Sequence, residues 1–82
     1  MEGWLRCRIA KGMFSDEFTV VIRRRGNGSV EFFVPNDQVK KGTGECGSVW
    51  VKVFHRHDGP WAELPTPYRD SVPVEEAELQ TT

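Results

Sequence analysis

Two histidines stand two residues apart in the segment His55-Arg56-His57-Asp58. On a β-strand, residues i and i+2 point to the same face, so His55 and His57 could present two imidazoles to one metal ion. Cys46, Asp58 and Glu63 are available for the remaining ligand positions. None of them stands at a spacing that fixes a metal site, so the sequence favours surface histidines at a turn. A metal-binding protein that uses His55 and His57 stays open as an alternative, and no bound metal or cofactor is expected.

The two cysteines are the other reactive side chains. Cys7 alternates with polar residues in a pattern that places it on an apolar strand face, where a thiol packs as a small hydrophobic residue. Cys46 lies in a polar, glycine-rich segment beside Glu45, whose charge disfavours a thiolate. The sequence contains neither the G-x-S-x-G of serine hydrolases nor a phosphate-binding glycine loop followed by Lys-Ser/Thr. We therefore expect a non-enzymatic protein.

Aromatic and basic residues alternate with apolar ones along four segments, so they would share the outer faces of strands. The predicted binding surface consists of ten such residues: Trp4, Arg6, Arg8, Arg23, Arg25, Phe33, Trp50, Lys52, Phe54 and Arg56. The structural alternative is that the rings pack beneath the C-terminal segment while the arginine stems cover apolar surface.

This surface predicts an interaction module that binds a peptide or a protein. The alternative is a small barrel that binds nucleic acid, because aromatic rings in a positive groove stack on single-stranded bases. The net charge of −1 disfavours that alternative, since contacts to phosphate dominate such affinity.

The charge is distributed unevenly along the chain. Residues 1–56 carry ten Lys or Arg against six Asp or Glu, a net +4, and residues 57–82 carry one Arg against six acids, a net −5. Such asymmetry suggests charged partners. Prolines stiffen the segment 64–68 that joins the two parts. We therefore hypothesise that the acidic C-terminal residues lie near the basic face and compete with its anionic partners.

Period-2 alternation predicts the strands that position these residues. The expected strands are 4–10, 18–25, 29–34, 48–56 and 61–64, with a single helical turn at 36–39 and a sixth, edge strand at 72–74. A glycine-containing turn at 26–28 joins the second and third strands. The apolar faces define the predicted core: Leu5, Cys7, Ile9, Phe18, Val20, Ile22, Val30, Phe32, Val34, Val49, Val51 and Val53.

These elements predict an all-β fold, a small five- to six-stranded antiparallel barrel of the SH3-like class, with an OB-like barrel as the alternative. Residues 1–70 would form the barrel domain, and residues 71–82 would form an extended acidic C-terminal tail.

The N-terminus has no apolar run after a positive start, so no secretory leader is predicted. No window approaches the roughly 20 apolar residues of a membrane span, so no membrane partner is expected. Two cysteines are too few for a disulfide framework. We expect free thiols and a cytoplasmic location, and the sequence carries no signal for an oligomeric state.

Overall fold

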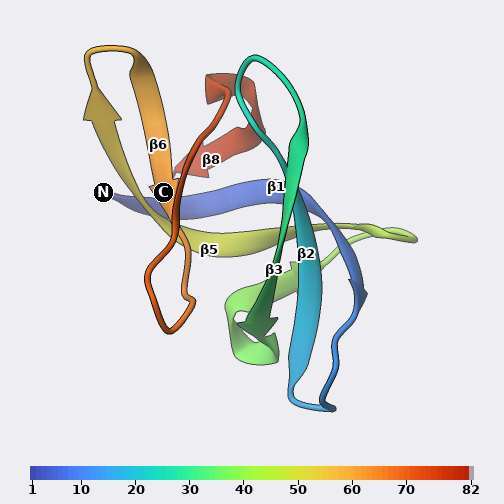
Figure 1. Cartoon of the computed structure of the whole chain (residues 1–82). Coiled ribbons are helices and arrows are strands. Elements are labelled where there is room, and N and C mark those ends of the chain that lie inside the picture. Colours follow the sequence, from blue (N-terminus) through green and yellow to red (C-terminus); the bar gives the residue numbers. More distant parts are fainter. Residues whose placement is uncertain (82) are drawn as a thin grey trace.

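The computed structural model describes residues 1–81 and is all-β. Within that range, eight strands form one antiparallel sheet that curls into a half-barrel (Figure 1). The strands are β1 (Glu2–Lys11), β2 (Glu17–Arg23), β3 (Ser29–Pro35), β4 (Val39–Lys41), β5 (Cys46–Arg56), β6 (Gly59–Glu63), β7 (Ser71–Pro73) and β8 (Leu79–Thr81). Two 3-10 turns, η1 (Asn36–Gln38) and η2 (Glu76–Glu78), precede β4 and β8. No helix within residues 1–81 has the length and apolar character to cross a membrane.

The two longest strands, β1 and β5, form the centre of the sheet, whose main order is β3-β2-β1-β5-β6-β7. β1 pairs with β5 through residues 2–8 along one edge. Along its other edge, β1 pairs first with β8 and then with β2. β5 likewise pairs with both β4 and β6 along the edge opposite β1. Each of the two long strands therefore pairs with two shorter strands, one after the other, along one edge. This change of partner along the edge lets the sheet curl.

The core lies on the concave face of the curled sheet, and the predicted alternation identifies most of it. Nine of the twelve predicted core residues are buried, and Phe18, Val30 and Phe32 are partly buried against them. The core also contains four residues that the prediction omitted: Ala62, Leu64, Val72 and Val74.

The glycine turn between β2 and β3 is confirmed, because Gly26 and Gly28 have φ angles of 95° and 81°. The second strand is shorter than predicted and ends at Arg23. Beyond it, the backbone N–H of Arg24 donates to the carbonyl of Gly28, and that of Arg25 donates to the carbonyl of Pro73. Arg25 therefore lies beyond the β2–β3 ladder, and its backbone N–H is bonded to the last residue of β7.

The last part of the chain differs from the predicted tail. Val72 and Val74 are 3% and 0% exposed, so residues that were assigned to the tail complete the core. β8 pairs with the N-terminal half of β1 (Gly3↔Thr81, Leu5↔Leu79). The predicted boundary after residue 70 therefore does not separate a tail from a barrel within residues 1–81. The sheet also has more strands than the five or six predicted, since β4 and β8 were not foreseen.

Candidate functional site

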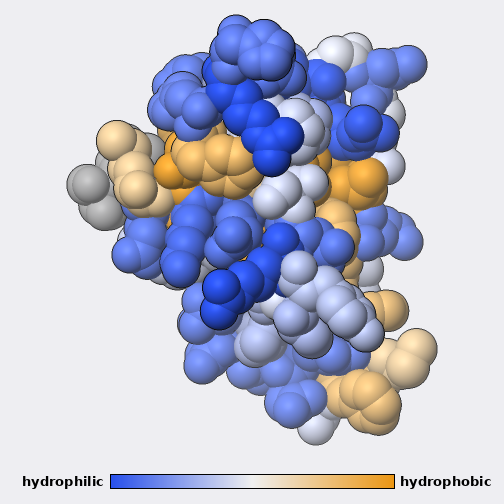
Figure 2. Space-filling view, turned by 60° about the vertical axis from the view of Figure 1, so that its left-hand side comes forward, coloured by the Kyte–Doolittle hydropathy of each residue, from blue (hydrophilic) through white to orange (hydrophobic). Residues whose placement is uncertain are grey.

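The ten predicted binding residues do not form one continuous surface in the structure. Five lie together on the outer face of β1 and β5: Trp4, Trp50, Lys52, Phe54 and Arg56. Arg6, Arg8 and Arg23 line a separate hollow. Arg25 and Phe33 each lie elsewhere. Most of the face shown in Figure 2 is hydrophilic, with hydrophobic patches between the polar side chains.

Trp4 and Trp50 form the first aromatic pair of the outer face. They are cross-strand partners in β1 and β5, and their ring centroids lie 5.0 Å apart with an edge-to-face angle of 69°. The indole N–H of Trp50 donates to Oε2 of Glu2 over 3.0 Å. The ammonium of Lys40 lies 5.7 Å from the centroid of the Trp4 ring, within cation–π range. Both rings are partly buried.

Phe54 and Trp61 form the second aromatic pair. The tight β5–β6 hairpin makes them cross-strand partners, and their rings stack with centroids 6.3 Å apart at 24°. The guanidinium carbon of Arg56 lies 5.3 Å from the Phe54 centroid and 4.3 Å from the Trp61 centroid. Trp61 was absent from the predicted site. The hairpin register could have revealed it, since a two-residue turn at 57–58 places residue 61 opposite residue 54.

A row of charged residues separates the two aromatic pairs. Lys52 is the cross-strand partner of Glu2 on one side and of Glu63 on the other. The three residues border a groove of about 440 Å³ that also reaches Trp50 and Arg69. We name the outer surface of β1, β4, β5 and β6 the aromatic face, defined by Trp4, Lys40, Trp50, Lys52, Phe54, Arg56 and Trp61.

Arg6, Arg8 and Arg23 form a second group, which we name the arginine groove. They line a hollow of about 280 Å³ together with Ser29, Cys46 and Glu78. Nη2 of Arg8 lies 2.7 Å from Oε2 of Glu45, and this hydrogen bond raises the pKa of Arg8 above its ordinary value. Nε of Arg6 lies 3.9 Å from Oε2 of Glu78. Glu78, from the predicted acidic segment, therefore lies beside one of the predicted basic residues, and its competition with an anionic partner stays a prediction.

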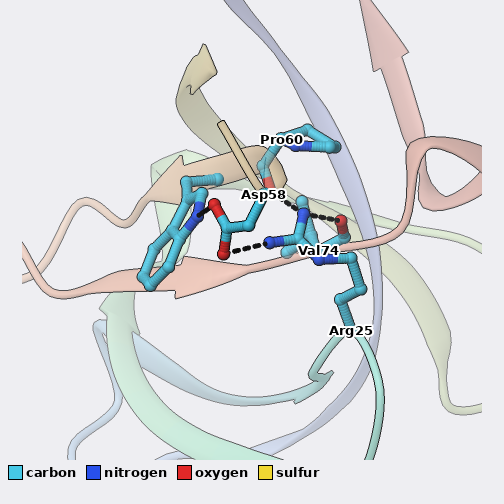
Figure 3. Close-up of polar contacts among 5 residues, drawn as sticks. Arg25, Asp58, Pro60 and Val74 are labelled. Carbon is cyan, nitrogen blue, oxygen red and sulfur yellow. Dashed lines mark hydrogen bonds and ion pairs between the residues drawn. The ribbon is translucent and has the colours of Figure 1, made fainter. Parts of the chain in front are cut away.

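Arg25, which was predicted to be part of the binding surface, lies apart from the aromatic face and acts as a structural clamp (Figure 3). Its Nη1 donates to the carbonyl oxygens of Pro60 (2.7 Å) and Val74 (3.3 Å), and its Nη2 donates to Asp58 (3.0 Å). The side chain is only 20% exposed. Asp58 also accepts the indole N–H of Trp61, and this hydrogen bond lowers the pKa of the carboxyl group. The guanidinium therefore ties the β2–β3 end of the sheet to β6 and to the segment after β7.

Phe33 is 49% exposed on β3 and lies apart from the other predicted residues. It borders a hollow of about 380 Å³ that is lined by Pro35, Pro65 and Pro67. The alternation along β3 placed Phe33 correctly on an outer face, but it gave no information on which other strands share that face.

The histidines and acids do not gather into a metal centre. Within residues 1–81, no three His, Cys, Asp or Glu side chains are grouped as a metal ion would require. His55 and His57 are exposed near the β5–β6 turn. Asp58, the nearest acid in the sequence, is held by Arg25 and Trp61.

Comparison with known proteins gives no further guide to function. No protein-family model, curated protein or solved structure matches this chain. Function therefore has to be argued from the geometry and chemistry of the site itself. The two surfaces that gather exposed charge or aromatic rings are the aromatic face and the arginine groove.

The two cysteines are free and lie on opposite faces of the sheet. Cys7 is paired with Gly47 in the β1–β5 ladder, so Cys46 projects to the other side of the pleat. Burial raises the pKa of the Cys7 thiol from 9.0 to about 11. The thiol is therefore protonated at neutral pH and packs as an apolar group.

A thiol reagent is expected to modify Cys46 and leave Cys7 intact in the native protein. Raising the pKa by two units lowers the thiolate population of Cys7 about 100-fold, and its burial blocks the reagent as well. Mass spectrometry after alkylation, with and without denaturant, measures both sites. Equal modification of Cys7 and Cys46 under native conditions would contradict the structure. Because the pKa of Cys7 is higher in the folded state, its contribution to stability should decline as the pH rises from 9.0 to about 11.

Proposed function

We propose that the protein is a non-enzymatic interaction module that binds an extended peptide or a protein surface through the aromatic face. The observation that carries the proposal is the arrangement of two aromatic pairs along one outer sheet face, each pair with a cation over a ring. Trp and Arg are the residue types that dominate binding energy at protein interfaces. Rings that are already fixed by packing lose little conformational entropy when a partner docks.

The charges between the rings favour a peptide or protein over a polyanion. Lys52 is flanked by Glu2 and Glu63, so the central row carries both signs of charge. A phosphate backbone that crossed this row would meet two carboxylates for one ammonium. A polypeptide with mixed charges can instead pair with all three groups.

Nucleic-acid binding is the second candidate. The contact of Arg56 with Trp61 and the position of Arg6 and Arg8 on the same strand face as Trp4 support it, since single-strand binders combine cations with stacking rings. The proposal also includes an SH3-like class of barrel, with an OB-like barrel as its alternative. It includes a cytoplasmic location, which the exposed free thiol of Cys46 supports because such compartments keep thiols reduced.

Peptides selected against the immobilised protein from a displayed random library test the proposal. The Trp61→Ala substitution should weaken binding of a selected peptide by about 30-fold, the effect of losing a roughly 2 kcal/mol aromatic anchor. Tyr68→Ala is the matched control, because Tyr68 is 91% exposed and lies outside the aromatic face. The Tyr68→Ala variant should bind the selected peptide with the same affinity as the native protein. Arg56→Gln, at an exposed position, is a second variant that should weaken binding without disturbing the fold.

Salt dependence separates the two candidates. Binding of peptide to the aromatic face should change little between low and physiological salt. A nucleic-acid complex that uses 6–10 phosphate contacts would lose about 10³-fold or more over a similar range. If no peptide shows the Trp61 dependence, or if a single-stranded oligonucleotide binds more tightly than every selected peptide, the proposal fails.

A further inference from the structure

The arginine groove brings three guanidinium groups from two neighbouring strands around one hollow. Arg6 and Arg8 come from β1, and Arg23 comes from the end of β2. We propose that this groove binds an acidic segment of a partner protein, and that two glutamates of the chain itself already pair with its arginines in this structure, Glu78 from within the groove and Glu45 from beside it. The site adjoins the aromatic face on β1 but uses none of the residues that define that face, so its test does not depend on the function proposed above.

Two carboxylates already show how such a ligand would be held. Glu45 reaches Arg8 from the loop before β5, over 2.7 Å. Glu78 reaches Arg6 from the turn before β8, over 3.9 Å. Arg23 forms no ion pair with any side chain of residues 1–81. Three guanidinium groups therefore face two carboxylates, of which only Glu78 lines the groove, so room remains for a further anion.

The glutamates are held weakly enough to be exchanged. The side chains of Arg8 and Glu45 are both 71% exposed. That of Arg6 is 64% exposed, whereas that of Glu78 is 25% exposed but reaches Arg6 only at 3.9 Å. Exposed ion pairs contribute little to stability, because water and salt screen them. An incoming peptide that carries several carboxylates can replace both glutamates and also engage Arg23, so it gains one contact that the chain itself does not make. Planar guanidinium groups suit carboxylates because they can donate two parallel hydrogen bonds.

The lining of the groove favours an acidic peptide over single-stranded nucleic acid. No aromatic ring is among the residues that line it. Proteins that bind single strands depend on such rings for base stacking. A peptide strand, in contrast, already lies beside these arginines, since β8 pairs with β1 at residues 3–5 and follows directly after Glu78.

The test uses the full chain and fluorescein-labelled hexaglutamate at low salt, with binding measured by fluorescence anisotropy. Arg23→Gln should weaken binding by about 10-fold, because it removes a charged donor. Arg23 has no ion-pair partner among residues 1–81, so the substitution leaves no carboxylate of the protein unpaired. Arg24→Gln is the matched control, since Arg24 is exposed, adjacent in sequence and not part of the groove. Its affinity should stay within about twofold of the native value. Glu78→Gln should strengthen binding several-fold, because it removes a resident competitor from Arg6.

A single-stranded hexathymidylate of similar charge forms the second arm of the test. If hexaglutamate does not bind, or if Arg23→Gln and Arg24→Gln have equal effects, the groove is not its site and the inference is wrong. If hexathymidylate binds more tightly than hexaglutamate with the same Arg23 dependence, the partner is a nucleic acid and the acidic peptide is excluded. NMR signals of the three arginine Nε–H groups, followed during the titration, locate the contact.

Discussion

A chain that ends at Asp70 should not fold. Removal of residues 71–82 deletes Val72 and Val74, which are 3% and 0% exposed in the core. Burial of one valine contributes about 1.5–3 kcal/mol, and the truncation also removes β7 and β8 from the sheet. Arg25 would lose the carbonyl oxygens of Pro73 and Val74 that it bonds in the native protein. The free energy of unfolding of a small domain is only about 5–15 kcal/mol, so the truncation would remove most of it.

Amide NMR and thermal melting followed by circular dichroism measure the result. The matched control is a chain that ends at Val74, which keeps both buried valines and the contacts of Arg25. It loses β8, including the partly buried Leu79, so it should fold with a melting temperature lower than that of the full chain. Well-dispersed amide signals from the chain that ends at Asp70 would show that residues 1–70 suffice and that the sequence-based boundary was right.

Replacing Arg25 by methionine should lower the free energy of unfolding by about 3 kcal/mol. The substitution keeps an unbranched stem but removes hydrogen bonds to Pro60, Val74 and Asp58. A hydrogen bond from a charged group contributes about 1.5–3 kcal/mol, and a carbonyl left without a partner adds a cost of its own. Because the Arg25 side chain is only 20% exposed, water cannot fully replace these donors.

Urea denaturation measures this change, with Arg24→Met as the control at the exposed neighbouring position. The control should change stability by less than about 0.5 kcal/mol. Equal stabilities for the two variants would mean that the clamp contributes nothing to closure of the half-barrel. A loss confined to Arg25→Met would show that this arginine, although predicted to bind a partner, stabilises the fold instead.

Sequence alternation was sufficient to predict the strands that bury one face. In β1 and β5, buried and exposed residues alternate over most of the strand, so the residues of the core could be identified from their spacing alone. β4 and β8 contain three residues each and follow 3-10 turns. Three residues carry too few alternations to be distinguished from a loop. β7 is as short, but Val72 and Val74 marked it as an edge strand, whereas β4 and β8 pair along the free edge of a long strand and have no such signal.

The candidate site was predicted less well than the core, for a related reason. Alternation assigns a residue to the outer face of its own strand, but it does not say which strands are neighbours. The pairing of β1 with β5 brings Trp4 to Trp50, whereas Arg23 joins the arginine groove and Phe33 lies apart. The structural contacts of Arg25 were not foreseen because its buried acceptors are backbone carbonyls, which leave no signal in the sequence.

The pairing of β1 with β8 has a consequence for the order of events during protein synthesis. Residues 3–5 leave the ribosome well before their partners at 79–81, because the two segments lie far apart in the chain. Until those partners emerge, one edge of β1 stays open to pairing with other chains. Contacts between residues this far apart in sequence also slow folding, because the loop between them must close first. We therefore expect this edge of β1 to be covered only after residue 81 has emerged, and the nascent chain to be most open to pairing with other chains until then.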